Sequence, residues 1–408
     1  MIDELDVARL MRAEVEAAET PSAVVNVERA MTVGRRQRWY ARSAGAALAV
    51  VAVVVGAVTV PGLVAPPDGS APSAQPSSLN LFGALAPLEP YTGKVPSPDT
   101  SRIPAALETI DPTVQYVRFG WLPSGLASLQ YQVGLLLSGP GVVLIGHAPD
   151  SPDGNSAAGV MVSLYPKGVT PPAPQVMGID QRAPTVSTAP APEVRGAAAT
   201  FTLYDVDGTD RLSLRWQYAP DGWAAVDVSP WAAGQDAREI ALHVAQKLRF
   251  STTERVRTPA QVTGVPQRLR LIYTTVNGPL TPEGWRWYAG VTYSAEPATA
   301  DPGRQRAKMV DVGFSPYVEM TDKIRAELKG KELFRPPNTT VDGHQASFYS
   351  AADDPNSSET LEVLDVRGMV VEIDAHRGTL DEPGTKGLFQ HLDLAEAKPD
   401  WRPALTVD

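Results

Sequence analysis

The sequence predicts an α+β fold in which an N-terminal transmembrane helix precedes two tandem repeats of a curved antiparallel sheet, each packed with a helix. Three observations predict it: one long uncharged apolar run, alternating apolar and polar residues between turn signals, and motifs that recur at a nearly constant offset. The expected parts are a cytoplasmic tail (1–42), the membrane helix (43–65), a proline-rich linker (66–112) and the two repeats (113–252 and 260–400).

The membrane helix is predicted by the stretch Ser43 to Pro67, twenty-five residues without a charge. A helix needs roughly 20 apolar residues to cross about 30 Å of hydrocarbon, and Ala44 to Ala65 provides them. Basic residues mark the cytoplasmic side of such a span, so we expect a single-pass protein of the cell membrane, with a cytoplasmic N-terminus and extracytoplasmic C-terminal domains. The topology-setting residues are Arg35, Arg36, Arg38 and Arg42.

A cleaved signal peptide is the alternative interpretation of this segment. It fits less well, because the apolar run exceeds the usual 7 to 15 residues and more than forty residues precede it. The chain contains no cysteine, which excludes both lipoprotein attachment and disulfide bonds.

The tail, residues 1–42, is expected to have two partners, the lipid bilayer and a cytoplasmic protein. Its arginines suit the anionic headgroups of the bilayer, the first expected partner. Two short stretches of helical periodicity, Ile2 to Met11 and Val24 to Met31, predict a docking peptide for a cytoplasmic protein, and a disordered leader explains them equally well. Beyond the tail, 39 acidic residues outnumber 29 basic ones, which argues against a nucleic-acid partner.

The linker and the repeats are predicted by composition and spacing. Eleven prolines lie between Pro61 and Pro112, which is typical of an extended spacer. Downstream, four pairs of motif positions are separated by almost one distance, and a period of this size indicates a duplicated domain. The pairs are Pro123 and Pro266, Met161 and Met309, Val194 and Val341, and Leu212 and Leu361, which are 143, 148, 147 and 149 residues apart.

Strand signals dominate each repeat. Apolar residues alternate with polar ones from Leu212 to Tyr218, the period of a strand with one buried face. Hairpin turns are expected at Asp207-Gly208 and 220–222, and at 353–356 and Arg367-Gly368 in the second repeat. Helices are expected at Asp236 to Leu248, Asp322 to Phe334 and Lys386 to Ala395.

No catalytic or metal constellation is visible. Asp205, Asp207 and Asp210 cluster, but a calcium loop requires glycine at its sixth position and Gly208 comes fourth. The chain has neither a G-x-S-x-G elbow nor an H-E-x-x-H motif, so we expect no enzyme, cofactor or metal. Tryptophans are candidates to line a pocket for an envelope ligand such as a lipid or sugar, and core packing is the alternative. They are Trp121, Trp216, Trp223, Trp285 and Trp287.

Residues 20–60 and 117–250 carry a family resemblance. The tail and apolar run, PSAVVNVERAMTVGRRQRWYARSAGAALAVVAVVV, resemble actinobacterial single-pass membrane proteins that accompany sigma factors. The motifs WLPSGL, VRGAAATFTLYD, LSLRWQYAPDGWAAVDVS and REIALHVAQKL are similar to the exported domain of anti-sigma-factor-like proteins. The tail lacks the histidine and two cysteines of zinc-binding anti-sigma domains. The resemblance implies a sensor or regulator.

Two functions follow from these features. The first is a membrane-anchored extracytoplasmic sensor or regulator, anti-sigma-like, that couples the exported tandem domain to the tail. It would bind an envelope ligand or protein outside and a cytoplasmic protein through residues 1–42. The alternative is an envelope-anchored ligand-binding or structural module with an inert tail.

Overall fold

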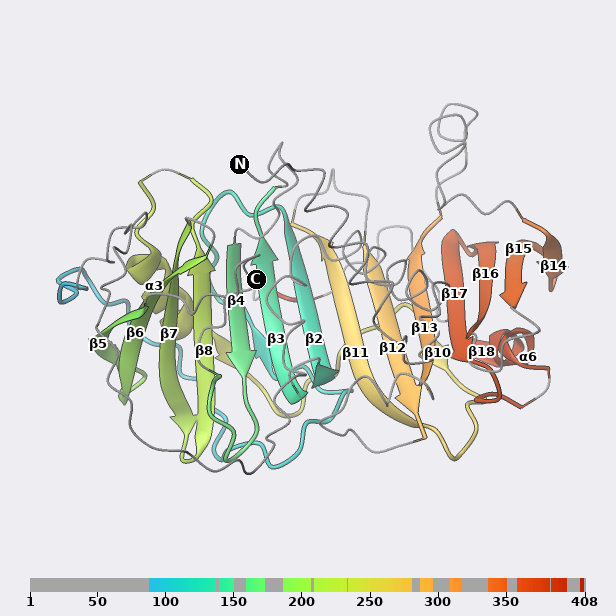
Figure 1. The fold of residues 1–408 in the computed structure, drawn as a ribbon, viewed down its shortest axis with the longest axis horizontal. Coiled ribbons are helices and arrows are strands. Elements are labelled where there is room, and N and C mark those ends of the chain that lie inside the picture. Colours follow the sequence, from blue (N-terminus) through green and yellow to red (C-terminus); the bar gives the residue numbers. More distant parts are fainter. Residues whose placement is uncertain are drawn as a thin grey trace, which may run out of the picture. The chain divides into compact units, whose positions relative to one another are not determined.

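Fourteen of the described strands form one antiparallel sheet, in the order β14-β15-β16-β17-β13-β12-β11-β2-β3-β4-β8-β7-β6-β5 (Figure 1). The computed structural model describes residues 88–136, 139–149, 159–172, 186–206, 209–232, 234–280, 287–295, 309–317, 337–350, 358–381, 383–394 and 404–406. All of them belong to one unit, Ser43–Asp408.

The first half of the sheet contains seven strands, and the second half contains seven more. The first-half elements are β2 (Ser128–Leu136), β3 (Gly139–His147), β4 (Gly159–Leu164), β5 (Val186–Val194), β6 (Ala197–Val206), β7 (Thr209–Ala219), β8 (Gly222–Ser229) and helix α3 (Ala237–Lys247). The second-half elements are β11 (Arg270–Pro279), β12 (Tyr288–Ser294), β13 (Met309–Pro316), β14 (Thr339–Val341), β15 (His344–Ser350), β16 (Ser358–Val366), β17 (Met369–His376) and helix α6 (Thr385–Gln390). Two small sheets pair β1 (Val117–Arg118) with β9 (Arg249–Phe250) and β10 (Gln261–Val262) with β18 (Leu392–Asp393).

The two halves have the same strand order. In each, a meander of three strands is followed by a meander of four, and the last strands of the two meanders pair, β4 with β8 and β13 with β17. The halves join where their first strands, β2 and β11, pair with each other. In this seam Gln132 lies opposite Thr275, Gly134 opposite Tyr273 and Gln130 opposite Asn277.

One face of the sheet forms the core. Successive side chains of a strand point to opposite faces, and the buried apolar residues of neighbouring strands fall on the same side. Tyr131, Leu144, Val312 and Ile373 are members of a single apolar cluster on this side. Helix α3 contacts β5, β7 and β8, and helix α6 contacts β16 and β17. The opposite side is called the polar face below.

Helix α3 forms where the sequence predicts it. Asp236 caps its first turn by accepting a hydrogen bond from the Arg238 N–H, and Lys247 lies in the last turn. Its apolar stripe, which includes Leu242 and Val244, is fully buried against the core face. The second predicted closing helix is shorter than expected, because α6 ends at Gln390 and the chain then enters β18.

The predicted fold class is wrong. The described residues are mostly strand, with α3 and α6 as their helices, and the expected tandem repeats are not separate sheets, since the seam between β2 and β11 merges them. No helix among the described residues has the length and apolar character needed to cross a membrane. The expected membrane helix (43–65), its arginines and the expected helix Asp322 to Phe334 lie outside the described residues.

The expected linker, 66–112, overlaps the folded part. From Leu88 onward the chain packs against the first half: Ile103 and Leu107 are buried in the core, and the Asp99 N–H donates to the Gln246 carbonyl at 2.8 Å. An extended proline-containing stretch can therefore lie along a sheet as well as away from it, because its few apolar residues still gain by burial.

Candidate functional site: the polar face of the sheet

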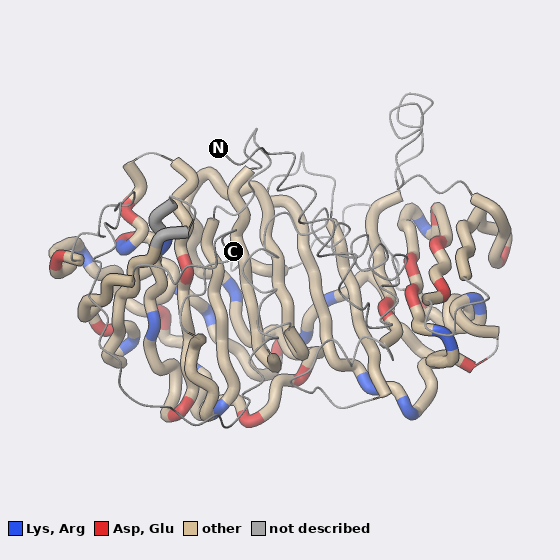
Figure 2. Tube along the Cα trace, in the orientation of Figure 1, with Lys and Arg blue, Asp and Glu red and all other residues tan. Residues whose placement is uncertain are grey.

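The polar face carries polar and charged side chains, as a solvent-facing side of a sheet does, yet many of them are buried. Buried members are Gln130, His147, Thr202, Ser213, Ser229, Thr275, Asn277, Thr292, Ser294 and Ser347. Charged residues are distributed unevenly over it: Arg211, Arg215 and Asp227 lie in the first half, and carboxylates gather on β13, β16 and β17 (Figure 2).

We call the second-half carboxylates, Asp311, Glu362, Glu372 and Asp374, the acidic patch. Register places them in two directly opposed pairs, Asp311 with Asp374 across β13 and β17, and Glu362 with Glu372 across β16 and β17. All four are half-buried and each has a contact within the protein. One such contact is the Thr292 hydroxyl, which lies 2.6 Å from a carboxylate oxygen of Asp311. The register therefore gathers four carboxylates on one part of the polar face.

Tyr288 lies flat beside the acidic patch. A Cβ on Gly290 or Gly313 would come within 2.6 Å or 2.9 Å of its hydroxyl oxygen, so the ring covers these two opposed glycines. Gly313 is in turn opposite Glu372. The glycines make room for an aromatic ring on the sheet surface next to the carboxylates, and such a surface suits cationic groups.

The first-half charges form a separate group. The Asp227 carboxyl lies beside Ser213 and the two arginines, but burial raises its pKa above the ordinary value. Burial also raises the pKa of Tyr165 to about 12 and that of Tyr204. The Arg215 guanidinium donates to the Pro172 carbonyl at 2.9 Å. These contacts tie Asp227 and Arg215 into the protein, whereas the buried Nε of Arg211 has no hydrogen-bond partner among the described residues.

The four candidate tryptophans that the structure describes do not meet around one pocket. Trp216 is fully buried in the core on β7, and Trp287 is buried at the start of β12. Trp223 lies on β8 opposite Gln217, on the polar face, and Trp121 stacks on His243 of α3. Trp285 lies outside the described residues.

The stack of Trp121 on His243 makes the stability depend on pH. The ring centroids are 3.7 Å apart, and burial together with the charge of Lys247 lowers the pKa of His243 below 6.5. The unfolded chain therefore binds the proton more readily, so the stabilisation is complete above about pH 6.5 and is lost as the pH falls toward the lower, folded-state pKa.

We expect the melting temperature of the wild type to drop between pH 7.5 and 5.5 by about 1–3 °C more than that of His243→Phe, which keeps the stack without the titrating ring. Thermal unfolding followed by circular dichroism measures this difference. Equal drops in both proteins would show that protonation of His243 does not oppose folding.

A shallow cleft of about 530 Å³ lies at the start of α3. Leu88, Leu203 and Leu212 form its apolar part, and Glu89, Asp236 and Arg238 its charged rim. The Arg238 side chain already donates to the Glu89 carbonyl, so the rim is tied together by internal contacts.

Within the described residues, no group of three or more His, Cys, Asp or Glu side chains is placed to hold a metal ion. The acidic patch was missed by motif reasoning, although it has a signal. The segment VVEIDAH alternates acidic with apolar residues, which places Glu372 and Asp374 on one face of a strand.

Comparison with known proteins does not assign the chain to a family. No family model matches the chain, and a search of curated proteins finds no match. The crystal structure of MucB in complex with MucA(peri) matches with 12% sequence identity and a TM-score of 0.19, over 66% of this chain and 94% of that chain. A similarity at that level assigns neither fold nor function.

Proposed function

We propose that this chain is a regulatory binding protein of the cell envelope, whose described part engages a partner protein through the acidic patch. The observation that carries the proposal is the pair of opposed carboxylate pairs, Asp311 with Asp374 and Glu362 with Glu372. A partner that brings basic side chains to this face meets a local concentration of negative charge, and complementary charges across an interface favour association. The role is binding and not catalysis.

We also propose that the apolar segment Ser43 to Pro67 holds the chain at the membrane, with residues 1–42 inside and the sheet outside. The uncharged segment and the preceding arginines support this. Protease added to intact cells is then expected to destroy an epitope tag placed after Asp408. A tag that survives, while a known exposed protein is cleaved, contradicts the proposal.

The tail can transmit the binding event through a cytoplasmic protein, or it can be inert. Deleting residues 2–30 while keeping the arginine cluster separates these functions. A regulator loses its effect in the cell, whereas an envelope-anchored binding module keeps it.

The test of the acidic patch uses a defined cationic probe. Decalysine binding to the detergent-solubilised full chain is expected to weaken at least about 10-fold in Glu362→Lys/Glu372→Lys, because two attractive charges become repulsive. Isothermal titration calorimetry at about 50 mM and 300 mM salt measures the affinity, which should fall with salt for the wild type.

The matched control is Glu108→Lys/Glu193→Lys, which makes the same change in net charge at exposed first-half positions. It is expected to change the affinity less than about 2-fold. An equal loss in both double variants would show attraction to net charge alone, and the acidic patch would then have no special role.

A further inference from the structure

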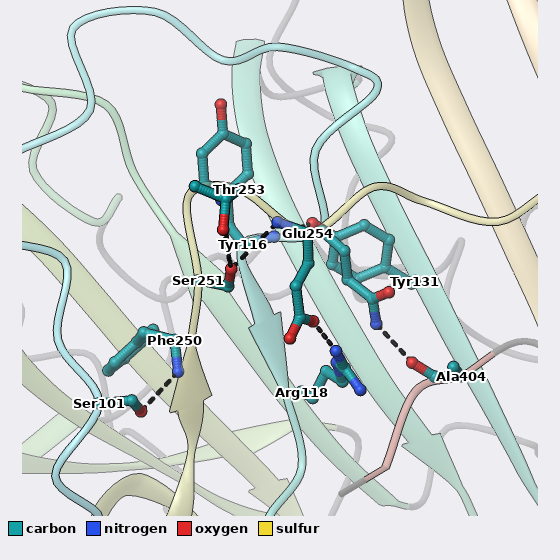
Figure 3. Close-up of polar contacts among 10 residues, drawn as sticks. Ser101, Tyr116, Arg118, Tyr131, Phe250, Ser251, Thr253, Glu254 and Ala404 are labelled. Atoms are coloured by element: carbon teal, nitrogen blue, oxygen red, sulfur yellow. Dashed lines mark hydrogen bonds and ion pairs between the residues drawn. The ribbon is translucent and has the colours of Figure 1, made fainter.

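The segment 113–119 contacts two other pieces of the chain, one along each side. On one side it pairs with 249–256, where the Gln115 N–H donates to the Glu254 carbonyl and the Ser251 N–H to the Tyr116 carbonyl. An ion pair between Arg118 and Glu254 ties the same side (Figure 3). On the other side lies Ala404–Thr406, which we call the strap.

The strap is bound as a peptide ligand would be. The Phe119 N–H donates to the Leu405 carbonyl at 3.1 Å, and Phe119 and Thr406 form a parallel bridge. The side-chain amide of Gln115 donates to the Ala404 carbonyl at 2.7 Å, the contact drawn at Ala404 in Figure 3. Leu405 is only 2% exposed and belongs to the apolar core. Main-chain hydrogen bonds plus one pocketed side chain is the pattern of strand addition.

We propose that the 113–119 edge is a binding site for an extended, leucine-containing peptide, and that the strap occupies it in competition with a partner. The site requires a replacement ligand, because the buried Gln115 amide and the Phe119 N–H lose their acceptors when the strap leaves. An incoming segment must therefore present two carbonyls and an apolar side chain with the spacing of the strap.

The strap is the part of this assembly that can exchange. Its described contacts are two hydrogen bonds and one buried leucine, whereas 113–118 is held by several bonds to 249–256 and by Tyr131. The Tyr131 hydroxyl accepts from the Tyr116 N–H at 2.8 Å and donates to the Val114 carbonyl at 3.0 Å. On these described contacts, we expect the strap to open at a lower free energy than the layer beneath it.

The test uses the full chain and a fluorescent peptide with the sequence of residues 402–408, followed by fluorescence anisotropy. The tethered strap competes at an effective concentration in the millimolar range, so the wild type is expected to bind the peptide weakly. Leu405→Asp removes the anchor of the strap and is expected to bind the peptide at least about 10-fold more tightly. A peptide with aspartate in place of its leucine should not bind either protein.

Two controls keep the proposal falsifiable. Leu405→Asp combined with Gln115→Ala should lose the gained affinity, and near-ultraviolet circular dichroism of both variants reports whether the core remains packed. Equal binding to the wild type and Leu405→Asp, or binding to neither, overturns the proposal. Amide exchange in the wild type is the second measurement: Phe119 should exchange faster than Gln115, whose N–H is bonded to the Glu254 carbonyl, and equal protection of the two would show that the strap does not open separately.

Discussion

Gly134→Ala is expected to lower the free energy of unfolding by about 2–6 kcal/mol. Gly134 lies on β2 at the seam with φ of +111°, and a Cβ there would come 2.1 Å from the Ile272 carbonyl oxygen of the other half. Backbone strain contributes about 1–3 kcal/mol and forced overpacking another 1–3 kcal/mol. Denaturant unfolding followed by tryptophan fluorescence measures the loss, and a second transition would indicate that the halves now unfold separately.

Gly139→Ala is the matched control. Gly139 begins β3 with nearly the same φ, +109°, but a Cβ there would have no atom of the described residues within 4 Å. It therefore isolates the backbone strain, and we expect a loss of only about 1–3 kcal/mol. If the two substitutions destabilise the protein equally, the close approach of β2 and β11 is not what requires glycine at position 134.

The strands could be predicted from the sequence, but their partners across the seam could not. Alternation and turn signals located β6, β7 and β8, with Asp221 and Arg367 in the left-handed turn conformation where hairpins were expected. If each repeat formed its own sheet, its first strand, β2 or β11, would have an unpaired edge. Merging the two sheets removes both edges, which would otherwise be sites of aggregation, and no local signal reports such long-range pairing.

The candidate site was hidden in part for the same reason. Asp311 is far in sequence from Glu362 and Asp374 and becomes their neighbour only because β13 pairs with β17, whereas β16 and β17 face each other across the expected turn at Arg367-Gly368. The tryptophans, by contrast, were predicted to line one pocket only because they share a residue type. Each tryptophan packs its large apolar surface at a different place, Trp216 in the core and Trp121 against His243 of α3.

Arg195→Ala is expected to lower the free energy of unfolding by about 2–4 kcal/mol, because the Arg195 side chain donates hydrogen bonds to carbonyls at the C-terminal end of α3. The last carbonyls of a helix have no partner within it and carry its negative dipole end. The guanidinium lies 4.7 Å from the centroid of the Phe250 ring, and burial lowers its pKa to about 10, so it remains charged at neutral pH. It donates to the carbonyls of Ser101, Ala245, Gln246 and Leu248.

Asp342→Ala supplies the comparison within the same protein. Asp342 occupies the matching hairpin, between β14 and β15, with φ of 49° against 55° for Arg195, and each is followed by a glycine. Its carboxylate accepts one exposed bond, from the Gln390 side chain at the end of α6 at 3.2 Å. Both substitutions place alanine at the same backbone conformation, so the difference between them measures the helix-end contacts, about 2–3 kcal/mol in unfolding free energy. Equal losses would mean that the turn conformation, and not the guanidinium, sets the stability at position 195.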